Sequence, residues 1–133
     1  MKFFFYGSLR TGYWNQWILS DTARKVGDAQ TLRPFKMYIG DYGNVPTVVP
    51  VEVGKSLRGE LYELDETDSQ RVYQLETGYD SGMFDVTTPD GVQHQAMIFH
   101  HTTPQACPYL RQDYTEVPSN DYTLAVSKTG KRL

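Results

Sequence analysis

The chain has 133 residues, of which 39% are hydrophobic and 22% charged, values typical of a single globular domain. Its net charge of −3 argues against a nucleic-acid partner, because phosphate backbones are bound by clustered Lys and Arg side chains. The one basic cluster, between Lys128 and Arg132, is interpreted as a solvated tail.

Cysteine usage and the first residues bear on the compartment. The single cysteine, Cys107, has no partner for an intrachain disulfide and cannot build a thiolate zinc cage, which suits a reducing compartment. The aromatic run at residues 2–6 stops at Gly7, so it is too short for a signal-peptide core or a membrane span. We therefore expect a cytoplasmic protein with no membrane partner.

The first elements are a strand and a short helix. Residues 2–6 are aromatic and predict a buried strand that ends at Gly7. A helix is expected over residues 15–22 with Asn15 near its N-cap. That expectation depends on residues that recur at helical spacing: Trp14, Trp17, Ile18 and Asp21.

Extended segments fill the middle of the chain. Strands are predicted at residues 25–32, 35–39, 45–53 and 57–64. The dipeptide Arg33-Pro34 is expected to separate the first two strands, and Pro46 and Pro50 exclude a helix from the third segment.

A second helix and a hairpin follow. Asp65 offers an N-cap for a helix over residues 65–77, which ends at Gly78. Residues 83–88 and 92–100 predict a hairpin around Pro89-Asp90-Gly91.

The remaining residues have little periodicity, so we divide the chain into a domain over residues 1–115 and a tail over 116–133. The tail is expected to wrap on the domain or to be partly disordered. Six or seven neighbouring strands and two helices predict the α+β class, as a small closed or nearly closed sheet with helices packed outside.

Two local patterns could carry chemistry. In Tyr6-Gly7-Ser8-Leu9-Arg10 a strand ends at a glycine and a polar turn follows, so successive main-chain N–H groups could bind a carboxylate or an oxyanion. An ordinary strand-to-loop turn would also explain this sequence.

The second pattern is Glu76, which lies at the edge of the buried face that Val72 and Leu75 define. Partial burial there would raise its pKa toward the range of a general base. The alternative is a surface glutamate on a helix.

Other chemistry finds little support. His94 and His100 share strand parity, but no third ligand follows at a recognisable spacing, so no metal site is expected. Phosphate-binding loops, the dinucleotide glycine fingerprint, the hydrolase nucleophile elbow and the zinc-protease helix are absent from the sequence.

Five segments, in order, carry a family resemblance: residues 4–15 (FFYGSLRTGYWN), Gly43-x-x-Pro46, residues 57–62 (LRGELY), Leu75-Glu76-x-Gly78-Tyr79 and Asn120-Asp121-Tyr122. Their pattern resembles the gamma-glutamylcyclotransferase-like family, which includes gamma-glutamylamine cyclotransferase and AIG2-like proteins. The resemblance covers roughly residues 2–100, with a weaker match in the tail.

The resemblance implies a small mixed β-barrel with flanking helices. It implies a reaction in which the α-amine of a small γ-glutamyl substrate attacks its own γ-carbonyl, releasing 5-oxoproline without a cofactor or metal. Glu76 would be the general base. The implied substrate-binding residues are Tyr6, Gly7, Ser8, Leu9, Arg10, Asn15, Pro46, Phe84 and Tyr122.

Two positions depart from the family pattern. Phe84 keeps an aromatic ring where the family has a tyrosine, but loses the hydroxyl, and Asn120 replaces a usual glycine, which a left-handed turn tolerates. These departures leave open a non-catalytic domain that keeps the pocket and binds a small ligand or a partner segment.

Overall fold

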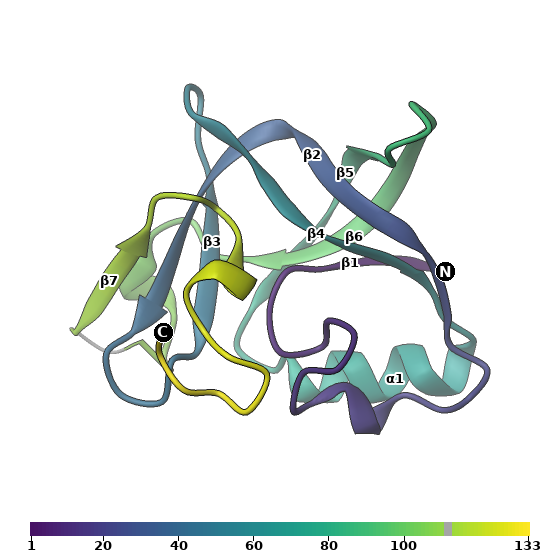
Figure 1. The fold of residues 1–133 in the computed structure, drawn as a ribbon, viewed down its shortest axis with the longest axis horizontal. Coiled ribbons are helices and arrows are strands. Elements are labelled where there is room, and N and C mark those ends of the chain that lie inside the picture. Colours follow the sequence, from purple (N-terminus) through teal and green to yellow (C-terminus); the bar gives the residue numbers. More distant parts are fainter. Residues whose placement is uncertain (111–112) are drawn as a thin grey trace.

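Five strands close into a barrel in the computed structural model, which describes residues 1–110 and 113–133 (Figure 1). They are β1 (Lys2–Phe5), β2 (Arg24–Gly40), β4 (Lys55–Glu63), β5 (Asp80–Thr87) and β6 (Gln93–His100). The order is β2-β4-β1-β6-β5, and β5 pairs back with β2 to close the barrel. Because β1 and β6 are parallel and the other barrel pairs are antiparallel, this is the small mixed barrel of the α+β class that the sequence predicts.

Strand β2 is one continuous strand, so the predicted separation at Arg33-Pro34 is wrong. The proline instead lies at a register shift between Gln30 and Pro34, where its missing N–H breaks no regular ladder. Beyond the shift, β2 pairs with β3 (Pro46–Pro50) and with β7 (Tyr114–Val117). The long strand therefore belongs to the barrel at one end and to a small outer sheet at the other (Figure 1).

The aromatic first strand is buried on both faces. Alternate residues of a strand point to opposite sides, so Phe4 enters the barrel core while Phe3 and Phe5 pack outside it. The outer cluster is covered by α1 (Glu66–Leu75), which contributes Val72. As predicted, Asp65 caps α1: its side chain accepts a hydrogen bond of 2.8 Å from the N–H of Asp68.

The predicted helix over residues 15–22 is only a short 3₁₀ turn, η1 (Gln16–Ile18). Asn15 does not cap it, because its side-chain amide donates instead to Oγ of Ser8 at 2.9 Å. Asp68 of α1 accepts the N–H of Ser20, which ties the following segment to α1. Tertiary hydrogen bonds therefore override the helical spacing in this segment.

The hairpin from β5 to β6 turns at residues 88–92, where the N–H of Gly91 bonds the carbonyl of Thr88 at 2.9 Å. Strand β5 begins at Asp80, three residues before the prediction, because residues 80–82 continue the pairing with β6. The rest of the chain includes two short 3₁₀ turns, η2 (Pro104–Ala106) and η3 (Tyr122–Leu124).

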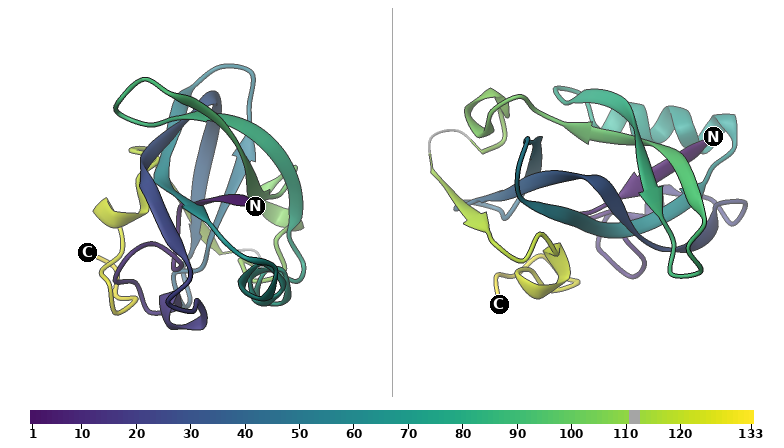
Figure 2. Two further views of the ribbon diagram at one scale, coloured as in Figure 1. Left: turned by 90° about the vertical axis from the view of Figure 1, so that its right-hand side faces the viewer. Right: turned by 90° about the horizontal axis from the view of Figure 1, so that it is seen from above.

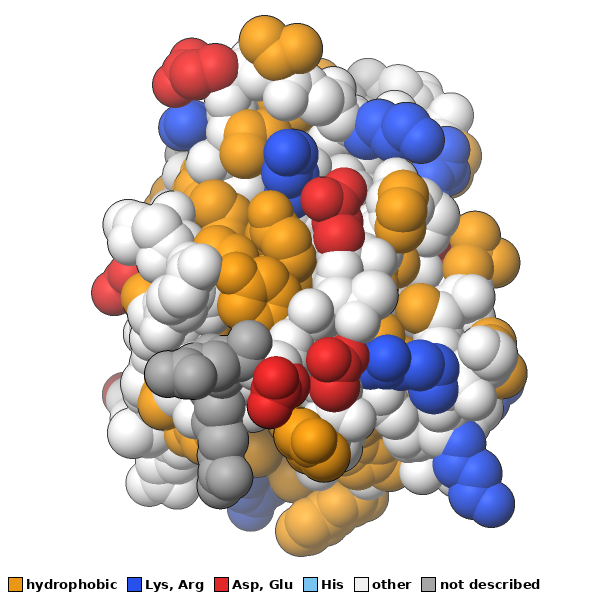
Figure 3. Space-filling view, turned by 90° about the vertical axis from the view of Figure 1, so that its left-hand side faces the viewer, with side chains coloured by type: hydrophobic (Ala, Val, Ile, Leu, Met, Phe, Trp, Pro, Cys, Tyr) orange, Lys and Arg blue, Asp and Glu red, His pale blue; other side chains and the backbone are white. Residues whose placement is uncertain are grey.

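Residues 116–133 pack on the barrel, and α1 lies on a different side of it (Figure 2). Val117, Tyr122 and Val126 are buried, and the predicted boundary at residue 115 falls inside β7. The face of the molecule on which β7 lies carries acidic and basic side chains around an apolar centre (Figure 3). Within the described residues, no helix is long and apolar enough to cross a membrane.

Candidate active site

A cavity of about 270 Å³ opens between the end of β1, the loop before β3 and the end of α1. This volume is slightly below the range of roughly 300–1,000 Å³ that drug-sized ligands occupy, so the cavity suits a small metabolite. Sixteen of the described residues line it: Phe4, Phe5, Tyr6, Gly7, Ser8, Leu9, Trp14, Asn15, Gly43, Val45, Pro46, Leu75, Glu76, Tyr79, Phe99 and Tyr109.

The segment after β1 has the carbonyl groups of residues 7–10 occupied, whereas the N–H groups of residues 7–9 have no acceptor among the described residues. The carbonyl of Gly7 accepts from the N–H of Arg10, and that of Ser8 accepts from the N–H of Asn15. The carbonyl of Leu9 accepts from the side chain of Gln16, and that of Arg10 accepts from the N–H of Tyr13. Of the residues that the structure describes, none accepts a hydrogen bond from the N–H groups of residues 7–9. These three residues line the cavity, and main-chain N–H groups that lack an acceptor are a feature of anion sites.

Glu76 follows the last residue of α1, and its main-chain N–H still bonds the carbonyl of Val72 at 3.0 Å. Its side chain is half-buried in the cavity wall. Burial raises the pKa of this carboxyl to about 7. Within the described part of the chain, no side chain or N–H group donates a hydrogen bond to it, so the carboxylate is free to act on a bound molecule.

Two tyrosines form the wall beside Glu76. The hydroxyl of Tyr6 donates to the carbonyl of Phe99 at 2.7 Å, and that of Tyr79 donates to the carbonyl of Pro46 at 2.5 Å. Burial raises the pKa of both hydroxyls far above the ordinary value, with a smaller contribution from Glu76, so both stay protonated. Both rings are therefore held in place by their own hydrogen bonds.

A histidine supports this wall from behind. The ring of His101 lies 4.4 Å from that of Tyr79, and its nitrogens bond Oγ1 of Thr47 at 2.6 Å and the carbonyl of Gly78 at 2.8 Å. Because both nitrogens are engaged, this histidine is a structural support for Tyr79.

The structure brings seven of the ten predicted site residues to the cavity. These are Tyr6, Gly7, Ser8, Leu9, Asn15, Pro46 and Glu76. The other three do not line it. Arg10 pairs with two carboxylates behind the turn, Phe84 packs on Phe35 and His100, and Tyr122 is buried with its hydroxyl on the carbonyl of Asn44.

Several lining residues were not predicted as site residues, among them Trp14, Tyr79 and Tyr109. Tyr79 stands in the same Glu-x-Gly-Tyr segment as Glu76, so that segment already contained the signal. Tyr109 comes from a loop far along the chain, and its hydroxyl reaches the carbonyl of Thr77 at 2.7 Å. Nothing in its local sequence indicates this contact.

A second hollow, of about 690 Å³, adjoins the cavity and shares Asn15 and Leu75 with it. Its other lining residues come from η1 and α1: Trp17, Ile18, Arg71 and Gln74. Trp17 is 80% exposed, and half of the Arg71 side chain is exposed. The hollow thus offers an indole ring and a guanidinium group beside the mouth of the cavity.

Metal-binding geometry is lacking in residues 1–110 and 113–133, where no three His, Cys, Asp or Glu side chains gather in a way that could hold an ion. His94 contacts the ammonium of Lys2 at 3.0 Å, and His100 packs against Phe84. Among the described residues, the polar groups around the cavity come from the main chain of the turn, the carboxylate of Glu76, the tyrosines and the side chains of Ser8, Asn15 and Trp14.

A small mixed barrel with this cavity defines the class of protein that the sequence resembles, the gamma-glutamylcyclotransferase-like proteins. The chain belongs to the family described as gamma-glutamyl cyclotransferase, AIG2-like, which it matches over residues 3–124.

One relative supports this assignment, and solved structures share the fold. A protein of Methanocaldococcus jannaschii, provisionally named a gamma-glutamylcyclotransferase, is 30% identical over 122 residues, covering 90% of this chain and 92% of that protein. A mouse AIG2-like protein shares the fold, with a TM-score of 0.69 and 23% identity over 91% of this chain and 92% of that chain. YkqA of Bacillus subtilis also has a TM-score of 0.69, at 25% identity, over 91% of this chain and 39% of its own.

Proposed function

We propose that this protein cyclises a γ-glutamyl amide to 5-oxoproline and releases a free amine or amino acid. The observation that carries the proposal is Glu76, an unpaired carboxylate with a pKa of about 7 in the wall of a small cavity. Near neutral pH a carboxyl with this pKa is populated in both its ionised and its protonated form, so it can accept a proton and return it in the same cycle. Family membership supports the reaction class.

The first step requires a base. The substrate's α-amine is an ammonium near neutral pH and must lose a proton before its nitrogen attacks the γ-carbonyl carbon. Glu76 takes that proton. The new C–N bond closes a five-membered ring, and the carbonyl π electrons move to oxygen to form an oxyanion.

The turn at residues 7–9 stabilises the negative charge of the substrate. Its free N–H groups bind the α-carboxylate of the substrate, the oxyanion, or both, without a charged side chain. The oxyanion then reforms the carbonyl as the bond to the leaving nitrogen breaks, and Glu76 returns its proton to that nitrogen. The ring nitrogen, which carries two hydrogens and a positive charge after the attack, gives its second proton to the departing amine, which leaves a neutral lactam and an ammonium. Because the nucleophile is part of the substrate, its effective concentration is already high, and no covalent enzyme intermediate is needed.

The leaving group occupies the second hollow. The leaving nitrogen must lie near Glu76 to receive its proton, and the hollow begins at Leu75, the neighbouring residue. An amine with an apolar body and a polar or anionic end would contact Trp17 and Arg71 there.

A screen of γ-glutamyl compounds with 5-oxoproline release as the readout tests the proposal. We expect turnover with at least one compound, and loss of that turnover in Glu76→Gln. Replacing Trp17 by Ala should raise KM for substrates with large leaving groups and leave a small γ-glutamyl amide unaffected. Absence of cyclisation across the screen, with γ-glutamyl ligands still bound, would instead identify a non-catalytic binding domain.

That alternative has two observations at the sequence level, the missing hydroxyl at Phe84 and the departure at Asn120 in the tail. In the structure Phe84 packs against Phe35 with ring centroids 5.2 Å apart, and it does not line the cavity. The lost hydroxyl therefore removes no group from the cavity wall, and the enzyme remains the better interpretation.

A further inference from the structure

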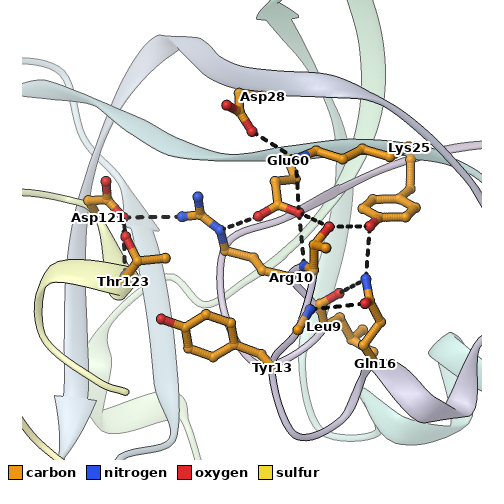
Figure 4. A network of polar contacts seen from close by, with 12 residues as sticks. Leu9, Arg10, Tyr13, Gln16, Lys25, Asp28, Glu60, Asp121 and Thr123 are labelled. Atoms are coloured by element: carbon orange, nitrogen blue, oxygen red, sulfur yellow. Dashed lines mark hydrogen bonds and ion pairs between the residues drawn. The ribbon is translucent and has the colours of Figure 1, made fainter. Parts of the chain in front are cut away.

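A buried carboxylate lies directly behind the turn that lines the cavity. Glu60, on β4, is only 5% exposed and does not line the cavity. One carboxylate oxygen accepts from Nε of Arg10 at 2.9 Å, and the other accepts from the N–H and the hydroxyl of Thr11 at 2.9 and 2.6 Å (Figure 4). Both oxygens are therefore bound to the two residues that follow the turn.

A second set of contacts surrounds this core. Nη1 of Arg10 lies 3.1 Å from Oδ1 of Asp121 in the tail, and Nζ of Lys25 lies 3.6 Å from Glu60 and 3.0 Å from Asp28 (Figure 4). Arg10 therefore joins a barrel strand to the tail across the back of the turn.

The hydroxyl of Tyr62 extends the network toward η1. It bonds the hydroxyl of Thr11 and accepts from the side-chain amide of Gln16 at 2.8 Å. The same Gln16 side chain accepts from the N–H of Gly12 at 3.0 Å and donates to the carbonyl of Leu9 at 3.4 Å. The chain is thus held at four successive residues, from Leu9 at the end of the turn to Gly12.

The network leaves the turn few alternative arrangements. A buried carboxylate is costly unless it is paired and hydrogen-bonded, so Glu60 strongly disfavours any conformation that removes Arg10 and Thr11. Burial alone would raise the pKa of Glu60, but the hydrogen bonds from Thr11 and Arg10 outweigh burial and hold it below the ordinary value. Glu60 is therefore ionised near neutral pH and attracts Arg10.

The position of Arg10 determines the backbone conformation of residues 7–9, because Arg10 is hydrogen-bonded to Gly7. The N–H of Arg10 donates to the carbonyl of Gly7 at 3.1 Å, and its carbonyl accepts from Tyr13 at 2.9 Å. These bonds define the turn whose N–H groups are left free. Main-chain donors stabilise charge best when they are held in place before the ligand arrives.

We propose that Glu60 is a positioning residue, which acts through Arg10 and Thr11 to hold the N–H groups of residues 7–9 in the geometry that binds the substrate's carboxylate or oxyanion. This inference rests on the proposed function of the cavity. It also reassigns Arg10, which the sequence suggested as a substrate ligand, to the support of the turn.

The test compares Glu60→Gln with a matched control, Asp68→Asn. Asp68 is the other fully buried carboxylate of the described residues that accepts a main-chain N–H across the fold, but it holds Ser20 and Arg71 rather than the turn. The two variants are therefore compared on a small γ-glutamyl amide, whose leaving group does not extend to Arg71. Both variants are expected to melt at lower temperature. Assayed well below either melting temperature, Glu60→Gln should lose roughly 10- to 100-fold in kcat/KM, and Asp68→Asn should stay close to wild type.

Two further readouts separate positioning from general stability. Affinity for 5-oxoproline should fall in Glu60→Gln only, while the pH midpoint of activity, set by Glu76, should not move. Amide exchange of Tyr13 and Asn15, whose N–H groups bond carbonyls of the turn, should accelerate in Glu60→Gln and not in the control.

The outcomes are distinct. A folded Glu60→Gln with wild-type kcat/KM, affinity and exchange overturns the proposal. If the wild-type protein cyclises no substrate, the proposed function is wrong. Amide exchange and affinity for 5-oxoproline in Glu60→Gln then test the positioning role on their own. If Glu60→Gln does not fold, Asp121→Asn replaces it, because Asp121 touches only Arg10 within this core; a smaller loss in the same readouts is expected, and none at all overturns the proposal.

Discussion

A Cβ atom on Gly7 would lie 2.8 Å from Cγ of Pro46, closer than real side chains approach one another. These two residues face each other from separate segments that both line the cavity. Gly7→Ala should therefore force the turn and the start of β3 apart, at a cost of roughly 1–3 kcal/mol in unfolding free energy. Chemical denaturation measures this cost, and the rate of 5-oxoproline release should fall with it.

Gly27→Ala is the matched control for that change. A Cβ at Gly27 would lie 3.7 Å from Cγ2 of Thr88, an ordinary contact, so this substitution should leave both stability and turnover nearly unchanged. Equal losses in the two variants would mean that the Gly7–Pro46 approach has no special role.

Replacing Glu76 by Gln keeps the size of the side chain and removes the base. We expect kcat to fall by roughly 100-fold or more, while affinity for 5-oxoproline persists because the turn is untouched. Ser8→Ala should do less harm, since the donors there are main-chain groups; it removes only the acceptor for the Asn15 side chain. Steady-state kinetics measures kcat of both variants, and calorimetry measures their affinity for 5-oxoproline. Near-normal turnover of Glu76→Gln would exclude Glu76 as the base.

The pH dependence of catalysis follows from the same carboxyl. Its pKa of about 7 means that the fraction of free enzyme with an ionised base rises through pH 7. The value of kcat/KM should therefore increase with a slope of one on a logarithmic scale below pH 7 and level off above it. A limb centred near pH 4.5 would show that Glu76 is not buried in the working enzyme.

Stability should change in the opposite sense. Because burial raises the pKa of Glu76 in the folded protein above its unfolded value, the folded state binds more protons between about pH 4.5 and 7. This residue's contribution to stability is thus lost as pH rises through that window, by at most about 3 kcal/mol. Glu76→Gln should be more stable than wild type at pH 8 and similar at pH 4, as measured by urea unfolding.

Asn120 tests how the tail is held. It has a positive φ of 54°, and its buried side chain bonds the N–H of Met37 and the carbonyls of Phe35 and Lys55, where β2 and β4 separate. Asn120→Gly keeps the backbone conformation but loses these bonds, which should cost about 2–3 kcal/mol. Asn120→Ala should cost about 1 kcal/mol more, because alanine is strained at positive φ. Equal stability of wild type and Asn120→Gly would show that the bonds contribute nothing.

Much of the fold was predictable because its signals are local. The aromatic first strand, the Asp65 cap and the glycine of the β5–β6 hairpin each depend on neighbouring residues. The continuity of β2 was not predictable, because its second half is stabilised by β3 and β7, which lie elsewhere in the sequence. The helix expected after Asn15 failed for the same reason, since Ser8 and Asp68 capture its polar groups.

The site residues likewise divide into those with a local sequence signal and those whose placement depends on distant residues. Glu76 and the turn at Gly7 are visible as local motifs, and the fold brings both to one cavity. Arg10 belongs to the same motif, yet its side chain turns away toward Glu60 and Asp121, which lie 50 and 111 residues along the chain. No local pattern indicates the direction of a side chain when its partners are that distant.

The free N–H groups of the turn have an evolutionary consequence. Every residue except proline supplies the same N–H, so a single substitution in the turn rarely deletes a donor, and the donors carry no charge that varies with pH. Ser8 and Leu9 can therefore drift among relatives while the chemistry persists. On the proposed function, the residues that shape the turn are Gly7, Arg10 and Glu60, so we expect a lineage that abandons the reaction to lose these together with Glu76.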